Sequence, residues 1–164
     1  MLGCMNRIIT LLFTLILSCP AGLSQSKLDA ASKAELEQCN QAIAKAPTAL
    51  NYALRARFYR VHELYKEAVE DDNRAIEIEP SNAFGWMVRG GDRCGMGHYK
   101  EALPDLNKAL SLAKNGDKVY INTLRERVHC NIHLGDKKSV FADQKVLVAL
   151  GAEPASSLYD ADLH

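Results

Sequence analysis

The sequence predicts an all-α fold in which pairs of antiparallel helices stack one after another, and three observations predict it. Residue types recur at a spacing of 34 along the middle of the chain. Hydrophobic residues make up 48% of the 164 residues but aromatic ones only 7%, and a chain rich in Ala and Leu favours helices over strands. Small residues also recur where the backbones of two packed helices would approach each other.

The spacing of 34 comes from two segments that align without a gap. Each has an aromatic residue in a first helix, a small residue four positions later, and two alanines seven positions apart in a second helix. Pro80 follows the first segment, and Gly97 marks the turn between the helices of the second. We expect the small residues to let the helix backbones approach and the large ones to fill the gaps toward the next hairpin. The matched pairs are Tyr52/Trp86, Ala56/Gly90, Tyr65/Tyr99, Ala68/Ala102 and Ala75/Ala109.

A third, more diverged copy follows, with its turn at Gly135, 38 residues after Gly97. The four extra residues fall around Asn115-Gly116-Asp117. Because Gly stops helices and Asp caps their starts, this segment predicts a connection with the next helix beginning early. Four residues are about one helical turn, so the insertion lengthens the helix and leaves its faces in phase.

Charged residues keep the same spacings of 34 and 38. We predict that each arginine in a first helix pairs with the aspartate of its own second helix. The alternative is that both sets are solvated surface residues. The predicted pairs are Arg55/Asp71, Arg89/Asp105 and Arg127/Asp143.

These residues resemble the tetratricopeptide-repeat (TPR) family, whose period is 34, over roughly residues 31–150. The resemblance implies a TPR domain over 27–150, a right-handed superhelix of about three hairpins behind a half-repeat. One amphipathic helix over Lys33–Lys45 represents the half-repeat, the kind of cap that the end of a solenoid needs. The assigned segments are a half-repeat at 27–47, repeats at 48–81, 82–115 and 117–150, and a tail at 151–164.

In the TPR family, the first helices line a concave groove that holds other proteins. The groove-facing positions of the family, carried over to this sequence, are Leu50, Arg57, Arg60, Phe84, Met87, Gly91, Cys94, Asn122, Arg125, His129 and His133. Arginines and histidines stand among them and no acid does. We therefore expect a non-catalytic interaction scaffold that holds an acidic or C-terminal peptide segment over a floor of Phe84 and Met87. The alternative is that these charges are scattered over the surface and have no role in binding.

Glycines crowd the first helix of the second repeat, at Gly85, Gly90, Gly91 and Gly95. Gly90 is the expected small packing residue. The others indicate either a weak helix stabilised by its neighbours or a shallow part of the groove where a ligand backbone comes close.

Catalytic, cofactor and nucleic-acid functions find little support. Lys and Arg total 20, as do Asp and Glu, so the basic excess typical of nucleic-acid binding is missing. His129 and His133 share a helix face and can bind zinc, but the sequence fixes no third ligand. A metal or redox protein using both histidines and Cys94 stays as an alternative. Without residues 1–24, the predicted signal peptide, the chain keeps Cys39, Cys94 and Cys130, and also Cys19 if it is lipidated. We interpret the three as buried small hydrophobes, because three is an odd number for a disulfide framework.

Residues 1–24 are predicted to be a signal peptide. Arg7 precedes an apolar run over residues 8–17, and small residues follow at 18–24. We expect export to a periplasm or envelope, or secretion. The stretch Ile16-Leu17-Ser18-Cys19 also resembles a bacterial lipobox, so a lipid-anchored envelope assembly factor is the alternative.

Overall fold

A computed structural model describes residues 28–152, in which every regular element is a helix. The predicted signal peptide with Cys19, and residues 153–164 of the predicted tail, lie outside the described residues. The chain divides into two compact units, 1–37 and 38–164, and the hairpins belong to the second. The helices are α3 (Ala30–Lys45), α4 (Ala49–Val61), α5 (Tyr65–Ile78), α6 (Ala83–Gly95), α7 (Tyr99–Leu112), α8 (Lys118–Leu134) and α9 (Lys137–Ala149).

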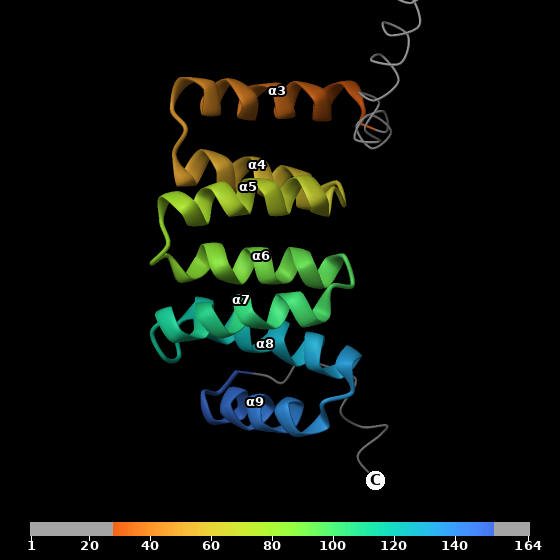
Figure 1. Cartoon of the computed structure of the whole chain (residues 1–164), viewed down its shortest axis with the longest axis vertical. Coiled ribbons are helices and arrows are strands. Elements are labelled where there is room, and N and C mark those ends of the chain that lie inside the picture. The colour runs from red at the N-terminus through yellow and green to blue at the C-terminus, as the bar shows by residue number, and fades with distance from the viewer. Residues whose placement is uncertain (1–27, 153–164) are drawn as a thin grey trace, which may run out of the picture. The chain divides into compact units, whose positions relative to one another are not determined.

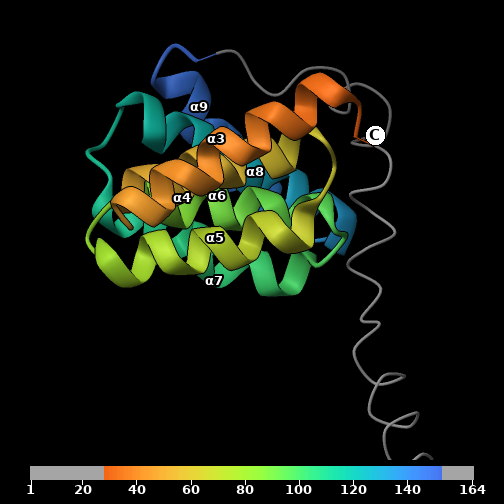
Figure 2. The ribbon, with the colours of Figure 1, turned by 90° about the horizontal axis from the view of Figure 1, so that it is seen from above.

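The helices from α4 onward form three sequential hairpins, α4/α5, α6/α7 and α8/α9 (Figure 1). Neighbouring hairpins pack through α5 against α6 and through α7 against α8. Seen from above, α5 and α7 lie on one side while α4, α6 and α8 lie on the other (Figure 2), and α6 also contacts α8 directly. The predicted all-α architecture of stacked hairpins is confirmed.

The helices begin where the sequence supplies capping side chains. Thr48 accepts a hydrogen bond from the Asn51 amide at 3.2 Å, and Asp117 accepts one from the Tyr120 amide at 2.7 Å. Asp29 caps α3 in the same way, so this helix begins at Ala30, and the predicted start at Lys33 is wrong by three residues.

The third hairpin shows what the four-residue insertion does. Helix α8 has 17 residues, whereas α4 and α6 have 13 each. The added turn begins after Asp117, as the sequence predicts. The insertion therefore lengthens one helix and leaves the hairpin intact.

The turns inside the hairpins require a left-handed residue. Gly97 and Gly135 have φ of 76° and 72°. Glu63, which stands 34 positions before Gly97, adopts φ of 58° without the freedom of a glycine. The first hairpin thus carries strain of roughly 1 kcal/mol at a place where the other two have none.

Small residues lie at the helix–helix contacts. Ala56, Ala68, Ala102 and Ala109 are fully buried. A Cβ added to Gly90 would lie 2.7 Å from Cδ2 of Leu106, so only glycine fits there without a shift of the leucine. These small repeat residues therefore stand where the helices approach most closely.

The recurring aromatic residue of the first helix is only partly buried. Trp86 and its equivalent Tyr52 are both half-buried. Its indole Nε1 donates to the Pro80 carbonyl at 2.8 Å, in the connection before α6. The Arg89 guanidinium carbon lies 4.8 Å from the ring centroid. The physical reason is that an indole has an apolar face and a polar edge. Trp86 therefore covers Arg89 from the rim of the stack.

The predicted arginine–aspartate pairs form in all three hairpins. Arg55 donates from Nε and Nη2 to Asp71 at 2.7 and 2.7 Å. The two distances are 2.9 and 2.6 Å from Arg89 to Asp105, and 2.8 and 2.5 Å from Arg127 to Asp143. The aspartate side chains are only 3–6% exposed, so these are largely buried, bidentate pairs.

Each of these arginines also reaches the hairpin or helix before its own. Nη1 donates to an asparagine Oδ1 at 2.7 Å in every case. The acceptors are Asn40 on α3 for Arg55, Asn73 on α5 for Arg89 and Asn107 on α7 for Arg127. Sequence reasoning missed these asparagines, although they recur at spacings of 33 and 34.

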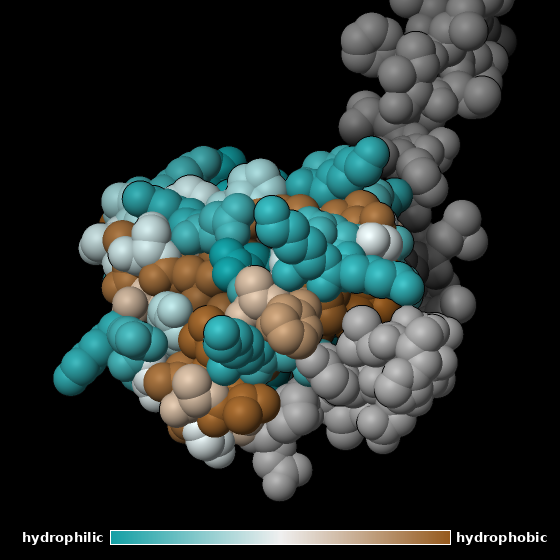
Figure 3. Space-filling model, turned by 90° about the horizontal axis from the view of Figure 1, so that it is seen from below, coloured by the Kyte–Doolittle hydropathy of each residue, from teal (hydrophilic) through white to brown (hydrophobic). Residues whose placement is uncertain are grey.

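The end of the stack formed by α9 carries apolar side chains on its outer face. Phe141 is 56% exposed and Val148 is 61% exposed. Seen from below, hydrophobic patches lie among hydrophilic residues (Figure 3). None of the helices within residues 28–152 combines the length and the apolar character that a membrane crossing requires.

The buried pairs predict a measurable coupling energy. Arg127 and Asp143 suit the test best, because Asp105 is shared between Arg89 and Arg93. We expect a double-mutant cycle with alanine at both positions to give a coupling of at least about 1 kcal/mol in urea unfolding. The exposed pair Arg74/Glu77 on α5 is the control, with about 0.5 kcal/mol or less expected. Equal coupling energies in the two cycles would show that burial does not strengthen the arginine–aspartate pair.

Candidate functional site

Four helices build a pocket of about 410 Å³ on the side of α4, α6 and α8. Five of the residues predicted for the groove are among its lining residues. The lining residues are Arg60 from α4, Tyr65 from α5, Met87, Val88, Gly91, Asp92, Cys94 and Gly95 from α6, and Glu126 and His129 from α8.

The remaining predicted groove residues lie outside the pocket lining. Leu50 and Phe84 are 66% and 47% exposed, so of the predicted floor only Met87 contributes to the pocket. Arg57 is exposed as well. Arg125 and Asn122 contact each other on α8, with Nη1 3.4 Å from Oδ1.

The expectation that no acid faces the groove is wrong. Asp92 and Glu126 both line the pocket. The carboxyl carbon of Glu126 lies 3.7 Å from the place where a Cβ on Gly91 would stand. A Cβ at Gly91 would make only ordinary contact with this carboxyl group, so only a longer side chain there would compete with Glu126 for the space. Groove positions taken one repeat at a time do not reveal this approach.

Gly91 and Gly95 of α6 test the two interpretations of its glycines, which are packing against neighbouring helices and a shallow part of the groove. A Cβ on Gly95 would lie 2.7 Å from Cε1 of Tyr65, so close packing against this ring requires a glycine. At Gly91 the nearest neighbour is the flexible Glu126 side chain, and the residue borders the pocket. Packing therefore explains Gly95, whereas Gly91 opens the site.

Two neighbouring carboxyl groups are buried at the pocket, and one of them, Asp92, belongs to its lining. Asp72 and Asp92 are 1% and 0% exposed. Asp92 stands 34 positions after Phe58 and 38 before Cys130, and both of these equivalents are buried. Asp72 stands 34 residues before buried Leu106. Both acids thus occupy places that the fold uses as core.

Burial is the main influence on these carboxyl groups. Within the described chain, Oδ2 of Asp72 and both oxygens of Asp92 have no hydrogen-bond partner. Burial, with the nearby charge of Asp92, raises the pKa of Asp72 to about 8. Burial also raises the pKa of Asp92, against the opposing charge of Arg60, whose Nη1 lies 3.6 Å away. At neutral pH the pair therefore holds a proton that ordinary aspartates would have lost.

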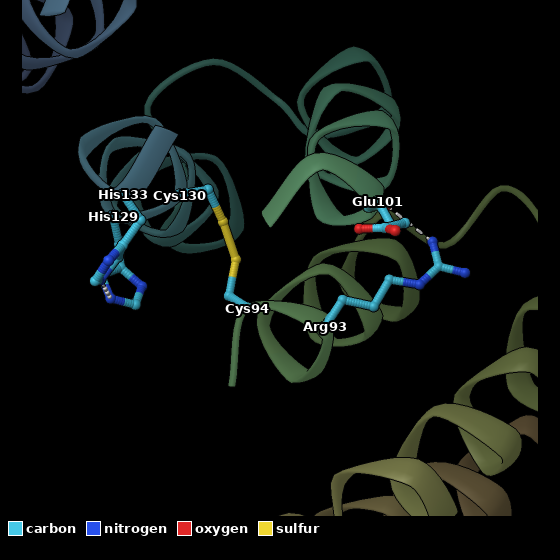
Figure 4. Close-up of a disulfide and its surroundings, with 6 residues drawn as sticks. All are labelled: Arg93, Cys94, Glu101, His129, Cys130 and His133. Atoms are coloured by element: carbon cyan, nitrogen blue, oxygen red, sulfur yellow. Dashed lines mark hydrogen bonds between the residues drawn. A yellow bond between two sulfur atoms is a disulfide. The ribbon is translucent and has the colours of Figure 1, made fainter. Parts of the chain in front are cut away.

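Cys94 and Cys130 form a disulfide that joins α6 to α8 (Figure 4). The interpretation of these two cysteines as buried small hydrophobes is correct about burial, at 3% and 0% exposure, but wrong about bonding. The contact of α6 with α8 brings residues 36 positions apart side by side, which the odd cysteine count concealed. While the bond exists, Cys94 has no thiol and cannot act as a nucleophile.

The two histidines of α8 face each other beside this disulfide (Figure 4). Their Nε2 atoms are 3.1 Å apart, and the His133 ring stacks on Tyr99 with centroids 4.4 Å apart. Potential ligand atoms of Cys94, Glu126 and His129 all lie within 4.8 Å of one another. The structure thus identifies neighbouring side chains of the histidine pair, which the sequence alone does not predict.

Comparison with known proteins points to the same fold. No protein-family model matches the chain. A stretch of 101 residues, 61% of this chain, is 34% identical to anaphase-promoting complex subunit 7 from Dictyostelium discoideum. This chain spans 17% of the length of that relative. The solved structure titled MamA MSR-1 C2 matches over 74% of this chain and 68% of its own, with a TM-score of 0.63 and 20% identity. This likeness confirms the TPR-type stacked hairpins and, at that identity, shows the fold alone.

The raised pKa of Asp72 predicts how stability depends on pH. Because the folded state holds the proton up to about pH 8 and an ordinary aspartate loses it near 3.8, stability falls as pH rises between these values. We expect Asp72→Asn to remove this part of the dependence and to raise the free energy of unfolding at pH 8 by about 1–3 kcal/mol. At pH 4 the variant should match the wild type.

Urea unfolding of both proteins from pH 4 to 9 measures the difference. Glu70→Gln on the exposed face of the same helix is the control and should leave the profile unchanged. Parallel profiles for wild type and Asp72→Asn would contradict the assignment.

Proposed function

We propose that this chain is a non-catalytic TPR scaffold that holds a segment of another protein against α4, α6 and α8. The observation that carries the proposal is the pocket, whose wall is assembled by four helices from three hairpins. It joins an apolar wall of Met87 and Val88 to the polar groups of Arg60, Asp92 and Glu126. A concave apolar site with few convergent polar groups suits the anchoring of a partner side chain.

The arginines of this face support an acidic partner. Arg60 is already opposed by Asp92 at 3.6 Å. Arg57 and Arg125 take part in none of the ion pairs formed within residues 28–152. We propose that these two guanidinium groups bind carboxylates of the partner on either side of the anchored residue, as Arg does in charge-assisted pairs.

The comparisons add limited support. The Dictyostelium relative is named as a subunit of a complex, which fits a chain that works by contact with other proteins.

A peptide selection tests the proposal. Random twelve-residue peptides displayed on phage would be enriched on the wild-type protein, and the affinities of the enriched peptides would be measured by fluorescence anisotropy. We expect acidic peptides that lose at least about tenfold in affinity for Arg57→Glu/Arg125→Glu. The matched control is Lys66→Glu/Arg74→Glu, which makes the same charge change on exposed positions of α5. Equal losses in the two double variants would place binding elsewhere.

We propose, separately, that the chain is exported behind the signal peptide of residues 1–24. The disulfide supports this proposal, because disulfides persist in oxidising compartments and are rare in reducing ones. The intact mass of the mature protein is the measurement. We expect a chain that begins after Ala21 or Ser24, and a chain that begins at Cys19 with added acyl mass would establish the lipid-anchored alternative. A full-length mass would exclude both.

A further inference from the structure

A group of metal-binding side chains surrounds the disulfide on the wall of the pocket. Sγ of Cys94, a carboxylate oxygen of Glu126 and a ring nitrogen of His129 lie within 4.8 Å of one another. Tetrahedral zinc with bonds of about 2.0–2.3 Å places its ligand atoms about 3.3–3.8 Å apart. A contraction of about 1 Å, which rotation of the Glu126 and His129 side chains can provide, would meet that requirement.

Helix geometry holds two of these ligands in place and adds a fourth. Glu126 and His129 are three positions apart on α8, so both project from one face. His133 follows four positions later, and its Nε2 is 3.1 Å from that of His129. Cys94 reaches Glu126 and His129 from α6, and the His133 ring would have to turn toward these three residues to join them. Two helices thus supply one sulfur, one carboxylate and two imidazoles, a set that zinc accepts.

The disulfide decides whether the sulfur is available. The ligand form of cysteine is the thiolate, and Cys94 is bonded to Cys130 instead. Both cysteines pack in one buried cluster with Ala102 and Leu106, and of the two only Cys94 also lines the pocket. Once the bond is cut, the Cys94 sulfur faces the pocket and the Cys130 sulfur stays in the core.

We propose that the Cys94–Cys130 disulfide is a redox gate on a zinc site made of Cys94, Glu126, His129 and His133. A dithiol reductant supplies two electrons and two protons, the S–S bond breaks, two thiols form, and the reductant leaves as its own disulfide. Zinc then displaces the proton of the Cys94 thiol. The charges of one thiolate and one carboxylate balance that of Zn²⁺, so the loaded site is neutral.

The pocket gives the metal a way in. His129 and His133 are exposed and Glu126 is half-buried, so three ligands contact solvent while Cys94 stays buried. This inference is independent of the proposed partner, because zinc alone is sufficient to test it.

The test uses the full chain with Cys4, Cys19 and Cys39 replaced by serine, so that only Cys94 and Cys130 remain. Zinc affinity and stoichiometry would be measured by titration of air-oxidised protein and of protein reduced with an immobilised phosphine. Co²⁺ would report the thiolate through sulfur-to-cobalt charge-transfer absorption. Cys130→Ser, Cys94→Ser and His129→Ala are the variants. His98→Ala, at an exposed histidine before α7, is the matched control.

We expect reduced protein to bind about one Zn²⁺ per chain, at least about tenfold more tightly than oxidised protein. Cys130→Ser should bind without reductant and Cys94→Ser should not bind with it. His129→Ala should lose at least about tenfold in affinity and His98→Ala should lose none. If circular dichroism shows that Cys130→Ser does not fold, the zinc affinities of the reduced parent protein and of reduced Cys94→Ser are compared instead, and this comparison decides whether Cys94 is a ligand. Equal affinity of oxidised and reduced protein, or full affinity in Cys94→Ser, would overturn the proposal.

Discussion

The bidentate arginine–aspartate pair is the interaction on which the register of this stack depends. In each hairpin one guanidinium group, on the first helix, binds the aspartate of the second helix of the same hairpin. It also binds an asparagine on the helix that comes just before its own in the chain. The planar fork of arginine accepts only one arrangement of these partners. A shift of either helix would leave a nearly buried carboxylate without its cation, which costs several kcal/mol. One side chain therefore fixes both the pairing within a hairpin and the step to the hairpin before it.

The chemistry of the pocket follows from that register. The disulfide between Cys94 and Cys130 requires α6 and α8 to lie side by side at one particular offset. The same offset sets Glu126 opposite Gly91, and His129 near the Cys94 sulfur. These contacts join different hairpins, so none of them would survive a change in the stacking, although each hairpin could still form.

The sequence therefore predicts the repeating features well and the contacts between repeats poorly. Spacings of 34 and 38 identify the arginine–aspartate pairs and the longer α8, because each depends on position within one repeat. Asn40, Asn73 and Asn107 recur too, but their partner lies in the next hairpin. The disulfide depends on which helices touch, and the approach of Glu126 depends also on the side chain that Gly91 lacks. The spacing of the repeats predicts neither of these.

The reactive and ionisable side chains of the pocket stand at positions where the residue type differs between the repeats. Arg57, Gly91 and His129 are equivalent positions in the three first helices, and each is followed by a second set of equivalents, Phe58, Asp92 and Cys130. The second position is buried in all three hairpins. Phenylalanine there is ordinary core, whereas burial raises the pKa of the aspartate and cysteine forms a bond to its neighbour. Because the recurring arginines, aspartates and small residues already fix the stack, these positions can differ without loss of the fold. Function in such a chain is therefore best sought where a buried or groove position departs from its equivalents in the other repeats.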